Sequence, residues 1–90
     1  MGVYNANWED EENYRIIKIA VEYLIEDDQV QILAVTPQNV TFIDQETMQV
    51  SRSIKIHTPT ARRILTDSYA EKVGMDRLEA VIREHALAVR

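Results

Sequence analysis

The sequence contains no cysteine, which excludes a disulfide framework and any metal site built on thiolate ligands. It has only two glycines, Gly2 and Gly74, so it lacks a glycine-rich loop that holds a nucleotide phosphate. No apolar run is long enough to span a membrane, and the acidic N-terminus lacks the apolar stretch of a secretory signal. From these absences we expect a cytoplasmic protein with no membrane partner.

The 90 residues suffice for one domain with a small core, so we expect a single domain over residues 1–90, with residues 1–7 as a loose tail. The net charge of −5 is unevenly distributed. Residues 1–50 carry two basic and ten acidic side chains, which gives −8, whereas residues 51–90 carry eight basic and five acidic, which gives +3. The second half is therefore able to face an anionic partner, unless the halves neutralise each other within one fold or between subunits.

The second half of the chain carries the clearest local signals. Ile54 and Ile56 alternate with polar residues, and this alternation predicts a strand. Thr58 and Pro59 are typical of the start of a helix and Gly74 of its end, so together they predict a helix between them. A second apolar helical face follows, which predicts a C-terminal helical hairpin.

The segment Tyr14–Ile25 fits two structures. As a helix, it collects its polar residues into one stripe, which includes the favourably spaced pair Lys18 and Glu22. As a strand, it places every second residue from Ile17 onward on one face, and its β-branched residues favour a strand. We predict an N-terminal helix because the polar stripe is continuous, and the strand is the alternative.

Three further runs, Val30–Val35, Val40–Ile43 and Met48–Ile56, have the composition of strands. Short turns with residues suited to reversing the chain separate them at 37–39 and 44–47. Consecutive strands joined by short turns favour antiparallel pairing. The predicted fold is therefore α+β, with an N-terminal helix, a three-stranded antiparallel meander and the C-terminal helical hairpin.

No group of residues has the spacing of a catalytic or metal-binding motif. His57 and His85 are far apart in sequence, and no neighbouring spacing gives either of them a second metal ligand. A serine, histidine and aspartate set can be drawn from the composition, but the spacing does not select one. We therefore expect a protein that is not an enzyme and that needs no cofactor or metal.

The order of strand, proline-initiated helix, glycine-ended turn and second helix resembles the ribbon-helix-helix family of dimeric DNA-binding proteins. The resemblance covers residues 51–90 and is carried by two segments, Ser53–Pro59 and Gly74–Ala80. In that family, strands of two subunits pair into a ribbon that enters the major groove of DNA, where outward side chains contact the bases.

The resemblance implies that Ser53, Lys55 and His57 contact bases and that Arg62 and Arg63 contact phosphates. It also implies a function, that of a small non-enzymatic regulatory protein. In this hypothesis the protein is a homodimer that binds DNA and controls transcription.

A second hypothesis is an acidic protein–protein interaction module that binds no nucleic acid. It rests on the acidic N-terminal half, which includes the run Glu9–Glu12, and on the wide apolar surface of the predicted first helix. The partner in this case is another protein. Under either hypothesis a homodimer would bury the surplus apolar surface.

Overall fold

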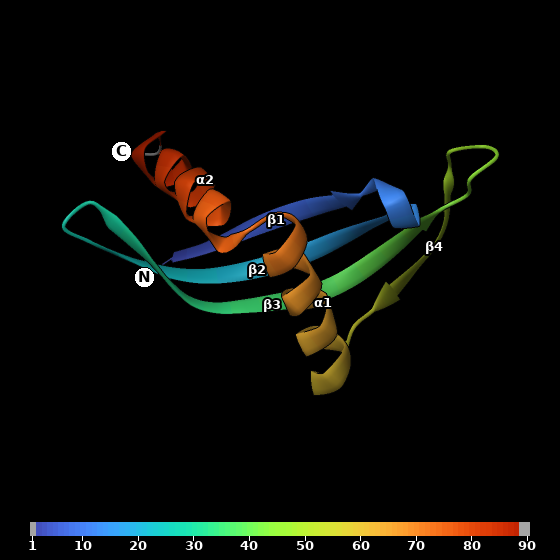
Figure 1. The fold of residues 1–90 in the computed structure, drawn as a ribbon, viewed down its shortest axis with the longest axis horizontal. Helices are drawn as coiled ribbons and strands as arrows, with labels where there is room; N and C mark the ends of the chain where they lie inside the picture. The colour runs from blue at the N-terminus through green and yellow to red at the C-terminus, as the bar shows by residue number, and fades with distance from the viewer. Residues whose placement is uncertain (1, 89–90) are drawn as a thin grey trace.

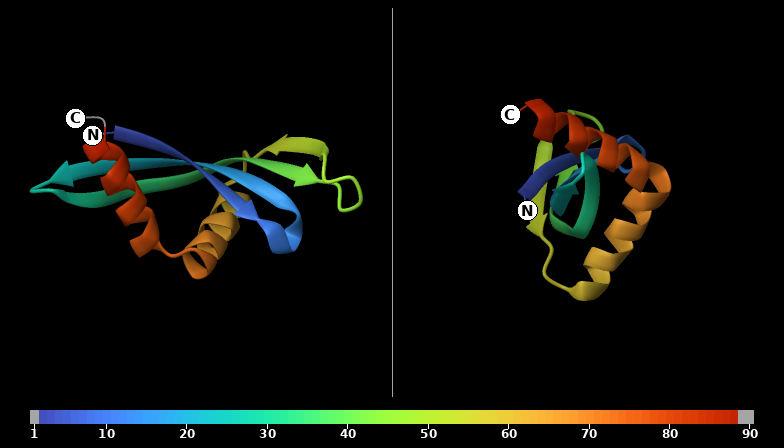
Figure 2. Two further views of the ribbon diagram at one scale, coloured as in Figure 1. Left: turned by 90° about the horizontal axis from the view of Figure 1, so that it is seen from above. Right: turned by 90° about the vertical axis from the view of Figure 1, so that its left-hand side faces the viewer.

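The structure, a computed structural model, describes residues 2–88, which form one small α+β domain. The strands are β1 (Gly2–Asp10), β2 (Arg15–Glu26), β3 (Gln29–Ile43) and β4 (Val50–Lys55), with a short 3₁₀ turn, η1 (Glu11–Asn13), after β1. The helices are α1 (Pro59–Lys72) and α2 (Met75–Ala88). The strands form one antiparallel sheet in chain order (Figure 1), and Figure 2 shows both helices on the same face of it.

The prediction of an N-terminal helix over Tyr14–Ile25 is wrong, because this segment forms β2, a central strand of the sheet. The polar stripe that favoured a helix includes Lys18 and Glu22, and residues four apart share a face in a strand as well as in a helix. Burial decides between the two structures. Ile17 and Ile19 are fully buried in the core, and β-branched side chains suit such a pleated surface.

The N-terminal segment is not a loose tail, because residues 2–7 belong to β1 and pair with β2. Tyr4, Ala6 and Trp8 face the core, and the asparagines between them are exposed. This alternation was not recognised in the sequence because alanine and asparagine are depleted in strands. Met1 lies outside the described residues.

The predicted three-stranded meander is also wrong, since the sheet has four strands. Val30–Val35 and Val40–Ile43 are parts of one long strand, β3, which runs through the predicted turn. The pairing of β3 with β2 skips Gln38, which makes a bulge next to the buried Pro37. A sheet tolerates proline at a bulge, because the proline there need not donate a hydrogen bond.

The core lies between the helices and the face of the sheet that they cover. Alternate strand residues and one stripe on each helix form it, namely Trp8, Ile17, Ile19, Val21, Val40, Leu65, Tyr69, Leu78 and Ile82. Trp8 of β1 meets Tyr69 of α1 edge to face, with ring centroids 5.6 Å apart. The buried residues of β2 lie at the centre of this core.

The two C-terminal helices are confirmed. The side chain of Thr58 accepts a hydrogen bond from the backbone N–H of Ala61, Pro59 occupies the first turn, and Gly74 has the left-handed φ of 93° between the helices. Both helices pack on β3 and are set at an angle to each other (Figure 1). In the part of the chain that the structure describes, no helix is long and apolar enough to cross a membrane.

We expect Ile19→Ala to lower the free energy of unfolding by about 2–5 kcal/mol, because it leaves a cavity at the centre of the core. Chemical denaturation of dilute protein measures this loss. The control is Ile64→Ala on α1, where the side chain is 59% exposed and the change should cost about 0.5 kcal/mol. Equal losses at the two positions would contradict the observed core.

Candidate functional site

On the face of the sheet that the helices leave open, a row of polar side chains crosses all four strands. The pairing of the strands places Asn7, Lys18, Asn39 and Lys55 side by side across β1, β2, β3 and β4. Neighbouring strands are about 4.8 Å apart, so the backbones of the two lysines are separated by about 10 Å. We call these residues the polar row; it combines two cations with two amides and contains no carboxylate.

The polar row borders a depression of about 350 Å³ beside the start of α1. Its lining consists of Lys18, Gln38, Asn39, Lys55, Ile56, His57 and Arg62, and we call it the basic depression. The guanidinium of Arg62 donates a hydrogen bond to the backbone carbonyl of Ile56 at 3.2 Å. This bond holds the guanidinium against the connection between β4 and α1.

The three lysine and arginine side chains of the basic depression form no ion pair with any residue that the structure describes. Among residues 2–88, the cations that form ion pairs are Arg15 and Lys72, and none of these pairs involves Lys18, Lys55 or Arg62. Like charges gathered on one surface repel each other, and a bound anion relieves this repulsion. The positive end of the α1 dipole lies beside them. The arrangement is therefore suited to an anion, and its separated donors suit one with several charges.

The structure brings together three of the five residues predicted to bind DNA. Lys55, His57 and Arg62 line the basic depression. Ser53 lies two residues before Lys55 on β4, where its hydroxyl shares a hydrogen bond with a threonine of β3. Arg63 is exposed on α1 and does not line the depression.

One edge of β4 is already paired within the chain. Ser53 lies opposite Thr41 of β3, and Ile54 lies opposite Val40. The ribbon implied by the family resemblance, in which this segment pairs with a second subunit, can use only the outer edge of β4. That edge is the end of the sheet, and β4 is exposed along its whole length.

Sequence analysis did not find Lys18 and Asn39. Lys18 lay in the predicted helix, where it was paired with Glu22, and Asn39 lay in a predicted turn. The strand alternative for this segment places Lys18 on the polar face of the strand. This was the one pattern in the sequence that could have assigned Lys18 to the open face of the sheet. It does not place Lys18 near Lys55, because that proximity depends on the register between β2, β3 and β4.

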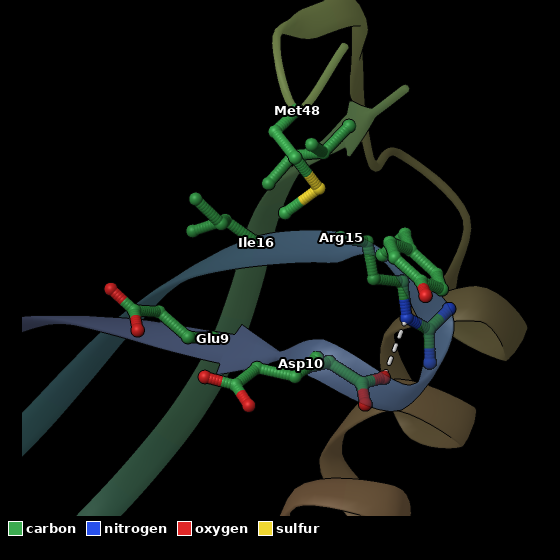
Figure 3. A pocket seen from close by; sticks show the side chains of 8 residues that line it. Glu9, Asp10, Arg15, Ile16 and Met48 are labelled. Atoms are coloured by element: carbon green, nitrogen blue, oxygen red, sulfur yellow. Dashed lines mark hydrogen bonds and ion pairs between the residues drawn. The ribbon is translucent and has the colours of Figure 1, made fainter. Parts of the chain in front are cut away.

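A second cavity, of about 610 Å³, lies where the β1–β2 turn meets the loop between β3 and β4 (Figure 3). We call it the end pocket; its lining consists of Glu9, Asp10, Glu11, Tyr14, Arg15, Ile16, Ile43 and Met48. The backbone N–H of Ile43 donates to the carbonyl of Tyr14 at 2.9 Å, and this bond joins the two sides. The lining is mixed, because apolar side chains lie beside three carboxylates and one guanidinium.

Asp10 organises one wall of the end pocket. It is 3% exposed and accepts hydrogen bonds from Arg15 at 2.8 Å and Asn13 at 2.9 Å, while the ammonium of Lys72 lies 3.6 Å from its other oxygen. Burial alone raises the pKa of this carboxyl, but the hydrogen bonds from Asn13 and Arg15 and the charges of Lys72 and Arg15 lower the pKa below its ordinary value. Asp10 therefore stays ionised and ties the β1–β2 turn to α1.

Within residues 2–88, no three histidine, aspartate or glutamate side chains converge where they could hold a metal ion. Comparison with family models, curated proteins and solved structures found no match to this chain. The function is therefore inferred from the basic depression, the polar row and the end pocket.

We expect Asp10→Asn to lower the free energy of unfolding by about 1–3 kcal/mol at neutral pH, because it removes the charge that pairs with Arg15 and Lys72. The pKa of Asp10 is lower in the folded than in the unfolded protein, so its ionised form stabilises the fold above about pH 4. This contribution is lost as the pH falls through the lowered pKa. Urea denaturation at a series of pH values should show a smaller acid dependence for the variant.

The matched control is Glu9→Gln, which removes the neighbouring, exposed carboxylate of the same strand. Because Glu9 forms no ion pair among residues 2–88, this change should alter the acid dependence of stability less than Asp10→Asn does. If the two variants have the same dependence on pH, the Asp10 ion pairs do not stabilise the turn.

Proposed function

We propose that this chain is a small non-enzymatic regulatory protein that binds nucleic acid through the basic depression and the polar row. The observation that supports this function is the cluster of Lys18, Lys55 and Arg62, none of which has an ion-pair partner among the described residues. The chain as a whole has a net charge of −5, so this cluster is a local positive surface on an acidic protein. An anionic partner gives it a physical reason.

The side chains of this surface are those that contact the backbone of nucleic acids. Lysine and arginine bind phosphate oxygens, and the amides of Asn7 and Asn39 add hydrogen-bond donors between the cations. His57 adds a further donor at the edge of the depression. Contacts of this kind fix the position of the protein on its partner and do not depend strongly on base sequence.

We infer that duplex DNA is a better partner than a single strand. Proteins that bind single strands stack the bases on aromatic side chains. In β1, β2 and β3, the aromatic residues Tyr4, Trp8, Tyr23 and Phe42 are in register with the covered face of the sheet. The open face of the described strands therefore lacks a stacking platform.

The second hypothesis, a protein-interaction module, is favoured by a different observation. The end pocket combines exposed apolar side chains with carboxylates, as expected of a surface that binds a basic partner. The two functions predict different behaviour toward DNA. If the protein contacts phosphates, its affinity for DNA falls steeply as the salt concentration rises. If it is a protein-interaction module, it has no measurable affinity for DNA at any salt concentration.

Fluorescence anisotropy with a labelled duplex of mixed sequence tests the nucleic-acid function. We expect binding that weakens as the salt concentration rises, because phosphate contacts release counterions. Lys55→Ala combined with Arg62→Ala should weaken binding about tenfold or more and should reduce the slope of log affinity against log salt by about two. Adding Lys18→Ala should reduce this slope further, by about one.

The matched control is Arg77→Ala combined with Arg83→Ala on α2, which makes the same change in net charge outside the basic depression. If the two double variants lose the same affinity for the duplex, binding depends on the net charge of the protein. That result would contradict a specific role of the basic depression. A protein that does not bind the duplex at low salt would leave the protein-interaction function as the one supported.

A further inference from the structure

The apolar part of the end pocket is not covered by any described part of the chain. Ile16 and Ile43 contribute from the open face of β2 and β3, and Met48 contributes from the loop before β4. Met48 is 65% exposed, and Figure 3 shows its side chain projecting from the loop toward β2. An exposed apolar surface of this kind is typical of a contact with another chain.

The loop that carries Met48 is held in a defined shape. The carboxylate of Asp44 accepts hydrogen bonds from the backbone N–H groups of Glu46 at 2.8 Å and Thr47 at 3.1 Å. The backbone N–H of Met48 donates to the carbonyl of Asp44 at 2.8 Å. Met48 is therefore a positioned element of the pocket, and its flexible side chain can adapt to an apolar partner.

The charges of the end pocket specify the other part of the partner. Three carboxylates against one guanidinium leave the lining with a formal charge of −2. Asp10 is paired with Arg15, so the uncompensated charge belongs to Glu9 and Glu11, which form no ion pair in the described part of the chain. The complementary partner presents an apolar side chain beside a cation.

This chain presents such a combination on α1. Ile64 is 59% exposed, and the neighbouring Arg63 is also exposed and forms no ion pair with Asp67, the carboxylate one turn along the helix. The core does not use these two residues, because α1 packs on the sheet through Leu65 and Tyr69. Arg63 and Ile64 thus form an exposed pair on α1 whose polarity and charge complement the end pocket.

We propose that the end pocket binds α1 of a second copy of this chain. In this contact Ile64 of the partner subunit packs on the apolar part of the end pocket. Arg63 of the partner subunit lies against Glu9 and Glu11. The contact is reciprocal in a dimer with two-fold symmetry, so each dimer contains it twice. It does not depend on nucleic-acid binding, because it uses none of the cations of the basic depression.

A charge exchange between two variants tests this contact. The pocket variant carries Glu9→Lys and Glu11→Lys, and the helix variant carries Arg63→Glu. Each variant alone brings like charges together in both contacts of the dimer, so its dissociation constant should rise about tenfold or more. In an equimolar mixture, each pocket meets a helix of opposite charge, and dimers should form again. Sedimentation velocity measures the three samples.

Two further variants complete the experiment. Arg83→Glu makes the same charge change on α2 and should leave the dimer intact, because Arg83 lies outside the contact. Ile64→Ser should weaken the dimer while lowering the stability of the dilute protein only slightly, as expected of an exposed side chain. Failure of Ile64→Ser to weaken the dimer would overturn the apolar part of the contact.

A wild-type chain that stays monomeric at high concentration would overturn the proposal, and a basic peptide of another protein would then be the occupant to test. A wild-type dimer that neither charge variant weakens, or a mixture that stays monomeric, would overturn it as well. None of these outcomes bears on the nucleic-acid function, which is tested with other residues.

Discussion

Burial of alternate side chains of β2 is the interaction on which the rest of the structure depends. Ile17, Ile19 and Val21 are fully buried between the helices and the neighbouring strands. Because side chains alternate across a strand, their burial turns Lys18 to the open face. The register of the sheet then sets Lys18 in line with Lys55. The polar row is therefore a consequence of how the core is packed.

The distribution of charge in the fold differs from its distribution along the chain. The acidic first half contributes Lys18 to the basic depression, where it joins Lys55 and Arg62 from the second half. Conversely, Lys72 of the second half forms an ion pair with Asp10 at the β1–β2 turn. Among residues 2–88, this arrangement leaves one surface with cations that form no ion pair and another with carboxylates that form none. Two surfaces of opposite charge suit the two different partners that we propose.

The proposed nucleic-acid surface and the proposed dimer contact are compatible. The first uses the open face of the sheet and the start of α1, and the second uses the end pocket and an exposed side of the same helix. A dimer would present two basic depressions to one polyanion. The resemblance to ribbon-helix-helix proteins also implied a dimer, but through strands, whereas the contact proposed here leaves the outer edge of β4 unused.

The sequence by itself determined the two C-terminal helices, because their signals are local. Thr58, Pro59 and Gly74 act on the backbone within a few residues of themselves, so their effect does not require knowledge of the fold. The α+β class and the pairing of β3 with the last strand followed from similarly short connections. Three of the predicted site residues met in one depression because they flank the same strand–helix connection.

Only the tertiary structure decided the state of residues 14–25 and the composition of the two sites. Lys18, Glu22 and Glu26 share a face in both a helix and a strand, so they did not separate the two structures; burial between β1 and β3 did. The polar row and the end pocket join residues that are distant in sequence. Their proximity depends on strand register and on the bulge at Gln38, which arise from long-range pairing.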